Sequence, residues 1–184
     1  MAFSTSISAA QYSGLAVSKG GAPATYDQSG FTARFPITAN AFLEIKNIRD
    51  LPAVGTPANI VKVPVYGSAQ TQSIGAQSDA PDLEVTVNYV AGDWAKAGVA
   101  FTGATSTLGD AVADGISKPF QLSMSTAKPT SLVATAGGLG TAPNAIIYFM
   151  GKIESLMVQP ARDDAVTATV ALSIQSDFYG PYTV

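Results

Sequence analysis

Residues 83–90 read Leu-Glu-Val-Thr-Val-Asn-Tyr-Val, the most regular segment of the chain. Apolar side chains occupy its odd positions, and polar side chains occupy its even positions as far as Asn88. Since successive side chains of a strand point to opposite faces of a sheet, this alternation predicts a strand with one buried and one exposed face. The fold class depends on how often such a pattern recurs.

Similar β-type patterns occur on both sides of this segment, separated by clusters of Gly, Pro, Asn and Asp. The clearest is 165–176, in which Val, Ala, Leu and Ile alternate with Thr, Ala and Ser. The other predicted strands are 15–18, 31–36, 41–48, 60–66, 118–125 and 146–160.

One segment, 106–115, predicts a short helix. Ser106 or Thr107 can cap its start, Asp110 falls in the first turn, and Gly115 suits its end. Strands dominate, so we expect an all-β domain with one short helix, built as a β-sandwich or partial barrel.

The chain predicts a single domain over 1–184, with no internal repeat. We interpret 1–30 as an irregular N-terminal arm and 177–184 as an aromatic C-terminal extension. The long inter-strand segment 49–82 contains a β run in which Pro64 favours an edge position, followed by a polar tract. Long polar insertions between strands are uncommon and usually functional. We interpret this one as an arm or hairpin that reaches another subunit, and a solvated surface loop is the alternative.

Charged residues make up only 12% of the chain, whereas a typical soluble domain has about 25%. A membrane or a surface covered by other copies can tolerate such a deficit. No apolar stretch approaches the roughly 20 residues that span a bilayer, which favours contacts between copies. The first residues show no signal-peptide pattern, so synthesis in a cytoplasm without export is expected.

The chain contains no His and no Cys. The commonest general base and the thiolate nucleophile are therefore both missing. Asp163 and Asp164 are adjacent between two predicted strands, which suits a hairpin turn better than a pair of catalytic acids. Trp94, the single tryptophan, suits a core or interface anchor better than a sugar-stacking platform. We therefore expect no enzyme, and we predict no catalytic residue, cofactor or metal site.

Two blocks carry a family resemblance. The first is 42–52, Phe-Leu-Glu-Ile-Lys-Asn-Ile-Arg-Asp-Leu-Pro, which leads through Ile74-Gly75 to the strand within 79–90. The second is 151–156, Gly-Lys-Ile-Glu-Ser-Leu, followed by the acidic turn and the alternating segment 165–172. Together they resemble the tail tube (major tail) proteins of long, non-contractile bacteriophage tails, those of siphophages.

This resemblance implies a structural subunit with a sandwich or partial barrel and one flanking helix. Six copies would form a ring, and stacked rings would form the hollow tube through which DNA is ejected into the host. The inner sheets of neighbouring copies would join into a continuous barrel, and the 49–82 segment would reach the adjacent ring. The implied partners are the chain itself, a tape-measure protein, a tail terminator and tail-tip proteins, with transient non-specific passage of DNA and no membrane insertion. The implied location is the virion tail, after assembly in the bacterial host cytoplasm.

Two residue sets follow as hypotheses. An acidic lumen would repel DNA phosphates, in keeping with the pI near 4.7, and its candidate acids are Glu84, Asp163 and Asp164. The candidate contacts between subunits and rings are Leu51, Pro52, Val61, Val63, Tyr66, Gln70, Gln72, Trp94, Tyr179 and Tyr182.

Two alternatives remain open. A tube subunit of a contractile tail or a type VI secretion-like system would share the same fold. A carbohydrate-binding or capsid-decorating β-sandwich is of another class, and it would need an exposed aromatic platform around Trp94.

Overall fold

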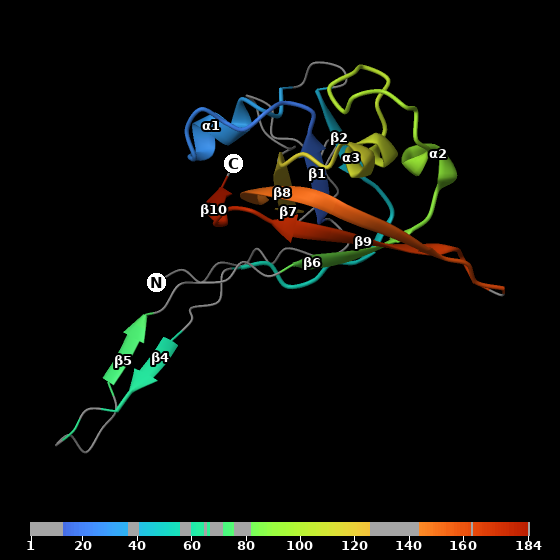
Figure 1. Ribbon diagram of the computed structural model, residues 1–184. Helices are drawn as coiled ribbons and strands as arrows, with labels where there is room; N and C mark the ends of the chain where they lie inside the picture. The colour runs from blue at the N-terminus through green and yellow to red at the C-terminus, as the bar shows by residue number, and fades with distance from the viewer. Residues whose placement is uncertain are drawn as a thin grey trace.

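Antiparallel strands are the main regular structure of the described residues, as the computed structural model shows (Figure 1). The structure describes residues 13–36, 41–55, 60–64, 66, 72–75, 82–125, 144–162 and 164–183. The main sheet contains β1 (Gly14–Ser18), β2 (Phe42–Ile45), β3 (Ile48–Asp50), β6 (Leu83–Asn88), β7 (Lys118–Ser125), β8 (Asn144–Gln159), β9 (Thr167–Ile174) and β10 (Tyr179–Thr183). The remaining elements are β4 (Ile60–Val63), β5 (Gln72–Gly75), α1 (Gln28–Thr32), α2 (Ala91–Trp94) and α3 (Leu108–Asp114).

The eight strands form one antiparallel sheet in the order β2-β1-β7-β8-β9-β6-β3, and β10 pairs with β8. The predicted β-rich fold is therefore confirmed. These strands do not form the two separate sheets of a sandwich, and the described strands do not close into a barrel.

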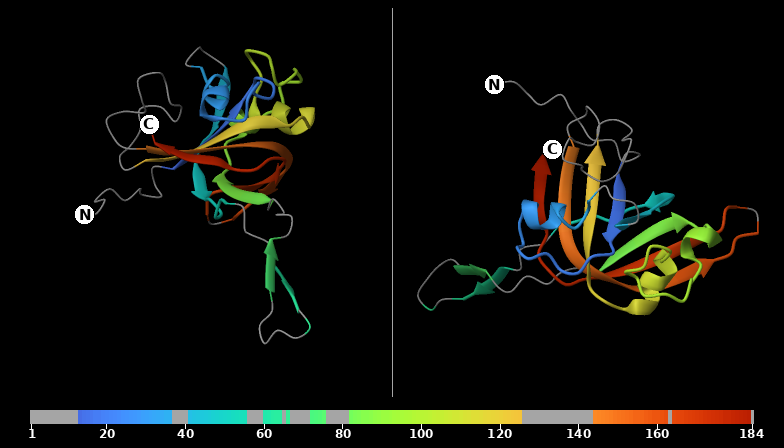
Figure 2. Two further views of the ribbon diagram at one scale, coloured as in Figure 1. Left: turned by 90° about the vertical axis from the view of Figure 1, so that its left-hand side faces the viewer. Right: turned by 90° about the horizontal axis from the view of Figure 1, so that it is seen from above.

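The 16-residue strand β8 explains how one sheet can surround a core. Its first half pairs with β7 on one edge and β10 on the other, and its second half pairs with β9. β8 thus belongs to two halves of the sheet, β2-β1-β7-β8-β10 and β8-β9-β6-β3, which lie in different orientations (Figure 2, right). Gly151 lies where the halves meet. A Cβ there would be 3.2 Å from the Ser173 carbonyl oxygen and 3.3 Å from the Phe149 ring, which leaves little room for a side chain.

The main core lies between the two halves. It takes alternate side chains from both, because each strand buries every second residue against the other half. α3 and Phe101 complete it. Its largest members are Leu15, Ile45, Leu83, Trp94, Phe101, Leu108, Phe120, Leu122, Phe149, Ile153, Leu172 and Ile174.

A second cluster covers the other face of the first half-sheet. Phe31 and Phe35 lie four residues apart, as suits one side of a helical turn, and they pack on Tyr148. The Asp27 side chain accepts a hydrogen bond from the Gly30 amide and caps α1. The strand predicted at 31–36 is therefore wrong, because this capped turn buries both rings against the sheet.

Local patterns elsewhere predicted the elements closely. β6 has the expected alternation of buried and exposed residues, and β7 has the predicted bounds. α3 begins with a capping box of Thr107 and Asp110 and ends at Gly115 in the left-handed conformation, as predicted. The expectation of one helix was too low, because α1 and α2 are also present. The predicted strand 41–48 is two strands, separated at Asn47, whose φ is 58°.

Candidate assembly surfaces

The second half-sheet, β8-β9-β6-β3, is open at both edges. β3 pairs with β6 on one side and with no described strand on the other. Residues 152–159 of β8 pair with β9 on one side. On the other side β7 begins at Lys118, opposite Gly151, and runs away from them, so their other edge has no described strand. Unpaired backbone edges of this kind are templates for pairing with another chain.

Large apolar side chains lie at the end of the open β8 edge. Val158 is 44% exposed and Met157 is 57% exposed, although both lie on a regular strand. Their partners on β9 show that the two side chains point to different faces of the sheet: Val158 pairs with the buried Ala168, and Met157 pairs with Thr169. An edge that a monomer leaves to solvent is usually protected by charge or by Pro. Lys152 and Glu154 place charge at the start of this open edge, whereas Val158 and Met157 place apolar side chains near its end.

The outer face of the second half-sheet is lined by small polar side chains. Across β6 and β9 the register pairs Glu84 with Ala171, Thr86 with Thr169, and Asn88 with Thr167. These residues alternate with the buried valines of β6 and β9, so they point away from the core. The face offers hydroxyl and amide groups, with Glu84 as its carboxylate in these three pairs.

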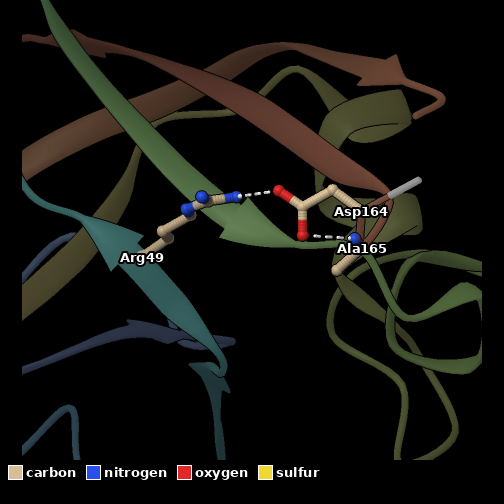
Figure 3. Close-up of polar contacts among 3 residues, drawn as sticks. All are labelled: Arg49, Asp164 and Ala165. Atoms are coloured by element: carbon tan, nitrogen blue, oxygen red, sulfur yellow. Dashed lines mark hydrogen bonds and ion pairs between the residues drawn. The ribbon is translucent and has the colours of Figure 1, made fainter. Parts of the chain in front are cut away.

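Two cations near this half-sheet are both held by carboxylates. The Arg49 guanidinium of β3 lies 3.5 Å from the Asp164 carboxylate, which also accepts the Ala165 amide at 2.7 Å (Figure 3). The Lys152 ammonium of β8 lies 3.0 Å from Glu154. Such exposed pairs add little to stability. They neutralise two of the positive charges on this side of the sheet; the exposed Arg162, in the connection between β8 and β9, is a further cation.

β4 and β5 form a two-stranded ribbon that stands away from the main sheet (Figures 1 and 2). They pair with each other, from Ile60 opposite Gly75 to Val63 opposite Gln72, and with no described strand of the main sheet. The described side chains Lys62, Pro64 and Tyr66 are all exposed. An isolated two-stranded ribbon is only marginally stable in water, so this one needs a surface to pack on.

The predicted contact residues differ in how exposed they are. Tyr66 is fully exposed at the ribbon, whereas Leu51 is half-buried against the main core beside Pro52. Tyr179 and Tyr182 of β10 are half-buried against the second cluster. Gln70 lies outside the described residues, and the structure describes the backbone but not the side chains of Val61, Val63 and Gln72.

Trp94 needs a correction. It ends α2, is 6% exposed, and belongs to the main core. Because Trp94 is buried within its own chain, its side chain is not available for a subunit interface. It also removes the aromatic platform that a carbohydrate-binding function would require at this residue.

Two of the three predicted lumen acids belong to the second half-sheet. Glu84 projects from its outer face, and Asp164 lies in the connection between β8 and β9. Asp163 lies outside the described residues. Sequence reasoning missed the open edge of β8. The length of the 146–160 segment was the available signal, because a strand much longer than its neighbours must leave part of an edge unpaired.

Two buried lysines tie the segment between α2 and α3 to the main sheet. Lys19 donates hydrogen bonds to the carbonyls of Gly103 and Ser106, at 3.0 and 3.4 Å. Lys118 donates to the Lys19 carbonyl and lies 5.7 Å from the centre of the Phe101 ring. Burial lowers the pKa of Lys19, and the nearby Asp110 charge partly opposes that shift. These contacts account for both lysines as structural groups.

Within the described parts of the chain, no three carboxylates gather as a possible metal site. Among the same residues, no helix is long and apolar enough to cross a membrane. No family model matches the chain, and no curated protein matches it.

Proposed function

We propose that this chain is the structural subunit of a bacteriophage tail tube of the long, non-contractile type. Copies form rings through the open edges of the second half-sheet, and the rings stack into a hollow tube for DNA. The observation that carries the proposal is this half-sheet, which is open at β3 and at residues 152–159 of β8.

Pairing the β3 edge of one copy with the β8 edge of the next uses both free edges at once. A head-to-tail contact of this kind closes into a ring when the rotation between copies is right. Each copy would then contribute the strands β3, β6, β9 and β8 to one continuous barrel. The exposed Val158 would be covered in this contact, which removes apolar surface from water.

The outer face of the half-sheet suits the lumen of such a barrel. Small polar side chains and Glu84 would line it, while Arg49 and Lys152 are already paired with carboxylates. A duplex could pass this surface with few cations to hold its phosphates, since phosphate neutralisation by Lys and Arg dominates non-specific DNA binding. The resemblance to tail tube proteins supplies the expected ring of six and the tape-measure, terminator and tail-tip partners.

A charge placed on the open edge tests the ring contact. Val158→Lys should leave the fold intact, because the side chain is already 44% exposed, but it should prevent ring formation by placing an ammonium in the contact. Val99→Lys is the matched control, since Val99 is similarly exposed at 41% and lies outside the strands. Sedimentation velocity and negative-stain microscopy report assembly. A Val158→Lys chain that forms rings as readily as the wild type would contradict the proposed contact.

A further inference from the structure

The groove beside β2 is the strongest remaining feature of the surface. It is lined by Phe42, Leu43, Glu44, Lys46, Gly92, Asp93, Ser106, Thr107 and Leu108, which come from β2, α2 and the start of α3. Its volume is about 310 Å³. This is small for a ligand pocket and suits a side chain or a short segment of backbone.

The groove also adjoins a free strand edge. β2 pairs with β1 on one side and with no described strand on the other. An extended segment could therefore add to the β2 backbone while a side chain enters the groove, which is the usual mode of β-augmentation. The groove walls combine apolar Phe42 and Leu43 with the carboxylates of Glu44 and Asp93, against the single ammonium of Lys46.

We infer that this groove is the docking site for the β4–β5 ribbon of a copy in the adjacent ring. The inference rests on the proposed tube and names the surface that its inter-ring arm binds. The ribbon has the complementary features: strand edges without a partner in the described chain, the exposed ammonium of Lys62 and the fully exposed ring of Tyr66. Lys62 would meet the Glu44 and Asp93 side of the groove, and Tyr66 would pack against its apolar wall.

The positions of the two features favour a second copy as the partner. The ribbon projects from one side of the molecule, whereas β2, α2 and α3 lie on the opposite side (Figures 1 and 2, left). In this arrangement the ribbon lies away from the groove of its own chain. A contact between different patches on two copies is heterologous, and when it does not close it propagates as a filament. This is the property that ring stacking needs.

Charge reversal tests the pairing. Lys62→Glu and Glu44→Lys should each raise the protein concentration needed for tube formation about tenfold or more, because like charges across an interface are strongly disfavoured. The double variant Lys62→Glu, Glu44→Lys should recover most of the loss. Lys96→Glu is the control, since Lys96 is exposed but does not line the groove, and it should assemble as the wild type.

Cross-linking gives a second measurement, because the chain contains no cysteine of its own. A Lys62→Cys chain mixed with an Asp93→Cys chain should form disulfide-linked dimers under assembly conditions. A mixture of Lys62→Cys with Asp177→Cys, an exposed position outside the groove, should not.

The outcomes separate this inference from the proposed function. Tubes that form normally from the single charge variants, or no recovery in the double variant, would overturn the groove assignment and leave the tube proposal standing. A wild-type chain that never assembles would overturn both.

Discussion

At the scale of single residues, the start of α3 shows how one short sequence determines a local structure. The Asp110 amide donates to the Thr107 hydroxyl, and the Asp110 carboxylate accepts the Thr107 amide at 3.0 Å. Asp110 also accepts the Gly98 amide at 2.9 Å and so fastens the loop after α2. One pair of side chains therefore orders both a helix terminus and a loop.

Removing the cap should weaken the fold. Thr107→Ala leaves amide groups at the start of α3 without their acceptor, and loss of such a cap costs about 1 kcal/mol of the free energy of unfolding. Urea denaturation of the monomer measures the change. Thr105→Ala, at an exposed position of the preceding loop, should change stability little; equal losses in the two variants would show that the cap is not responsible.

The same site predicts an acid dependence. Hydrogen bonds from backbone amides, led by that of Thr107, hold the pKa of Asp110 below its ordinary value of 3.8. The stabilisation is therefore complete above pH 3.8 and is lost as the pH falls towards the lower pKa of the folded state. Asp110→Asn should be less stable at neutral pH and should lose less stability on acidification. An unchanged slope of unfolding free energy against pH in that window would refute this role.

At the scale of elements, Gly151 occupies a crowded position where the two halves of the sheet meet. A Cβ added there would be 3.2 Å from the backbone oxygen of Ser173. Gly151→Val should lower the free energy of unfolding by about 1–3 kcal/mol, the usual cost of overpacking. Gly21→Ala is the control, since nothing lies within 4 Å of a Cβ at that position. Denaturation midpoints that fall equally would contradict the crowding at the bend.

The ribbon should be dispensable for folding and required for assembly. Replacing residues 60–75 by a short Gly-Ser linker removes β4 and β5, which pair only with each other among the described strands. The free energy of unfolding should stay close to that of the wild type, since loop length has a weak effect on closure entropy. Long tubes should no longer form. A shortened chain that still elongates would rule out the ribbon as the inter-ring arm.

Local patterns predicted the elements whose determinants are local. Alternation identified β6 and β9, and the cap and stop residues identified α3. α1 was missed because a five-residue helix has too few turns for a periodic pattern, and Phe31 and the nearby Phe35 read equally as β-type residues. The bend of β8 depends on which strands pair with each half, a non-local property that no window of sequence contains.

At the scale of the whole molecule, the low charge of the chain has a structural counterpart. Charged residues are 12% of the sequence, and the described surface presents an open β8 edge, an open β3 edge and a projecting ribbon. Copies can cover one another through these features. The sequence suggested an arm within 49–82 and Glu84 as a candidate lumen acid. It predicted neither the open β8 edge nor the groove beside β2, because segments that are distant in the sequence form both.

Negative-stain microscopy of the purified wild-type chain, alone and with a tail-tip initiator, tests the central claim most directly. The account predicts stacked rings or hollow tubes of one uniform diameter. Only monodisperse monomer under all these conditions would contradict it.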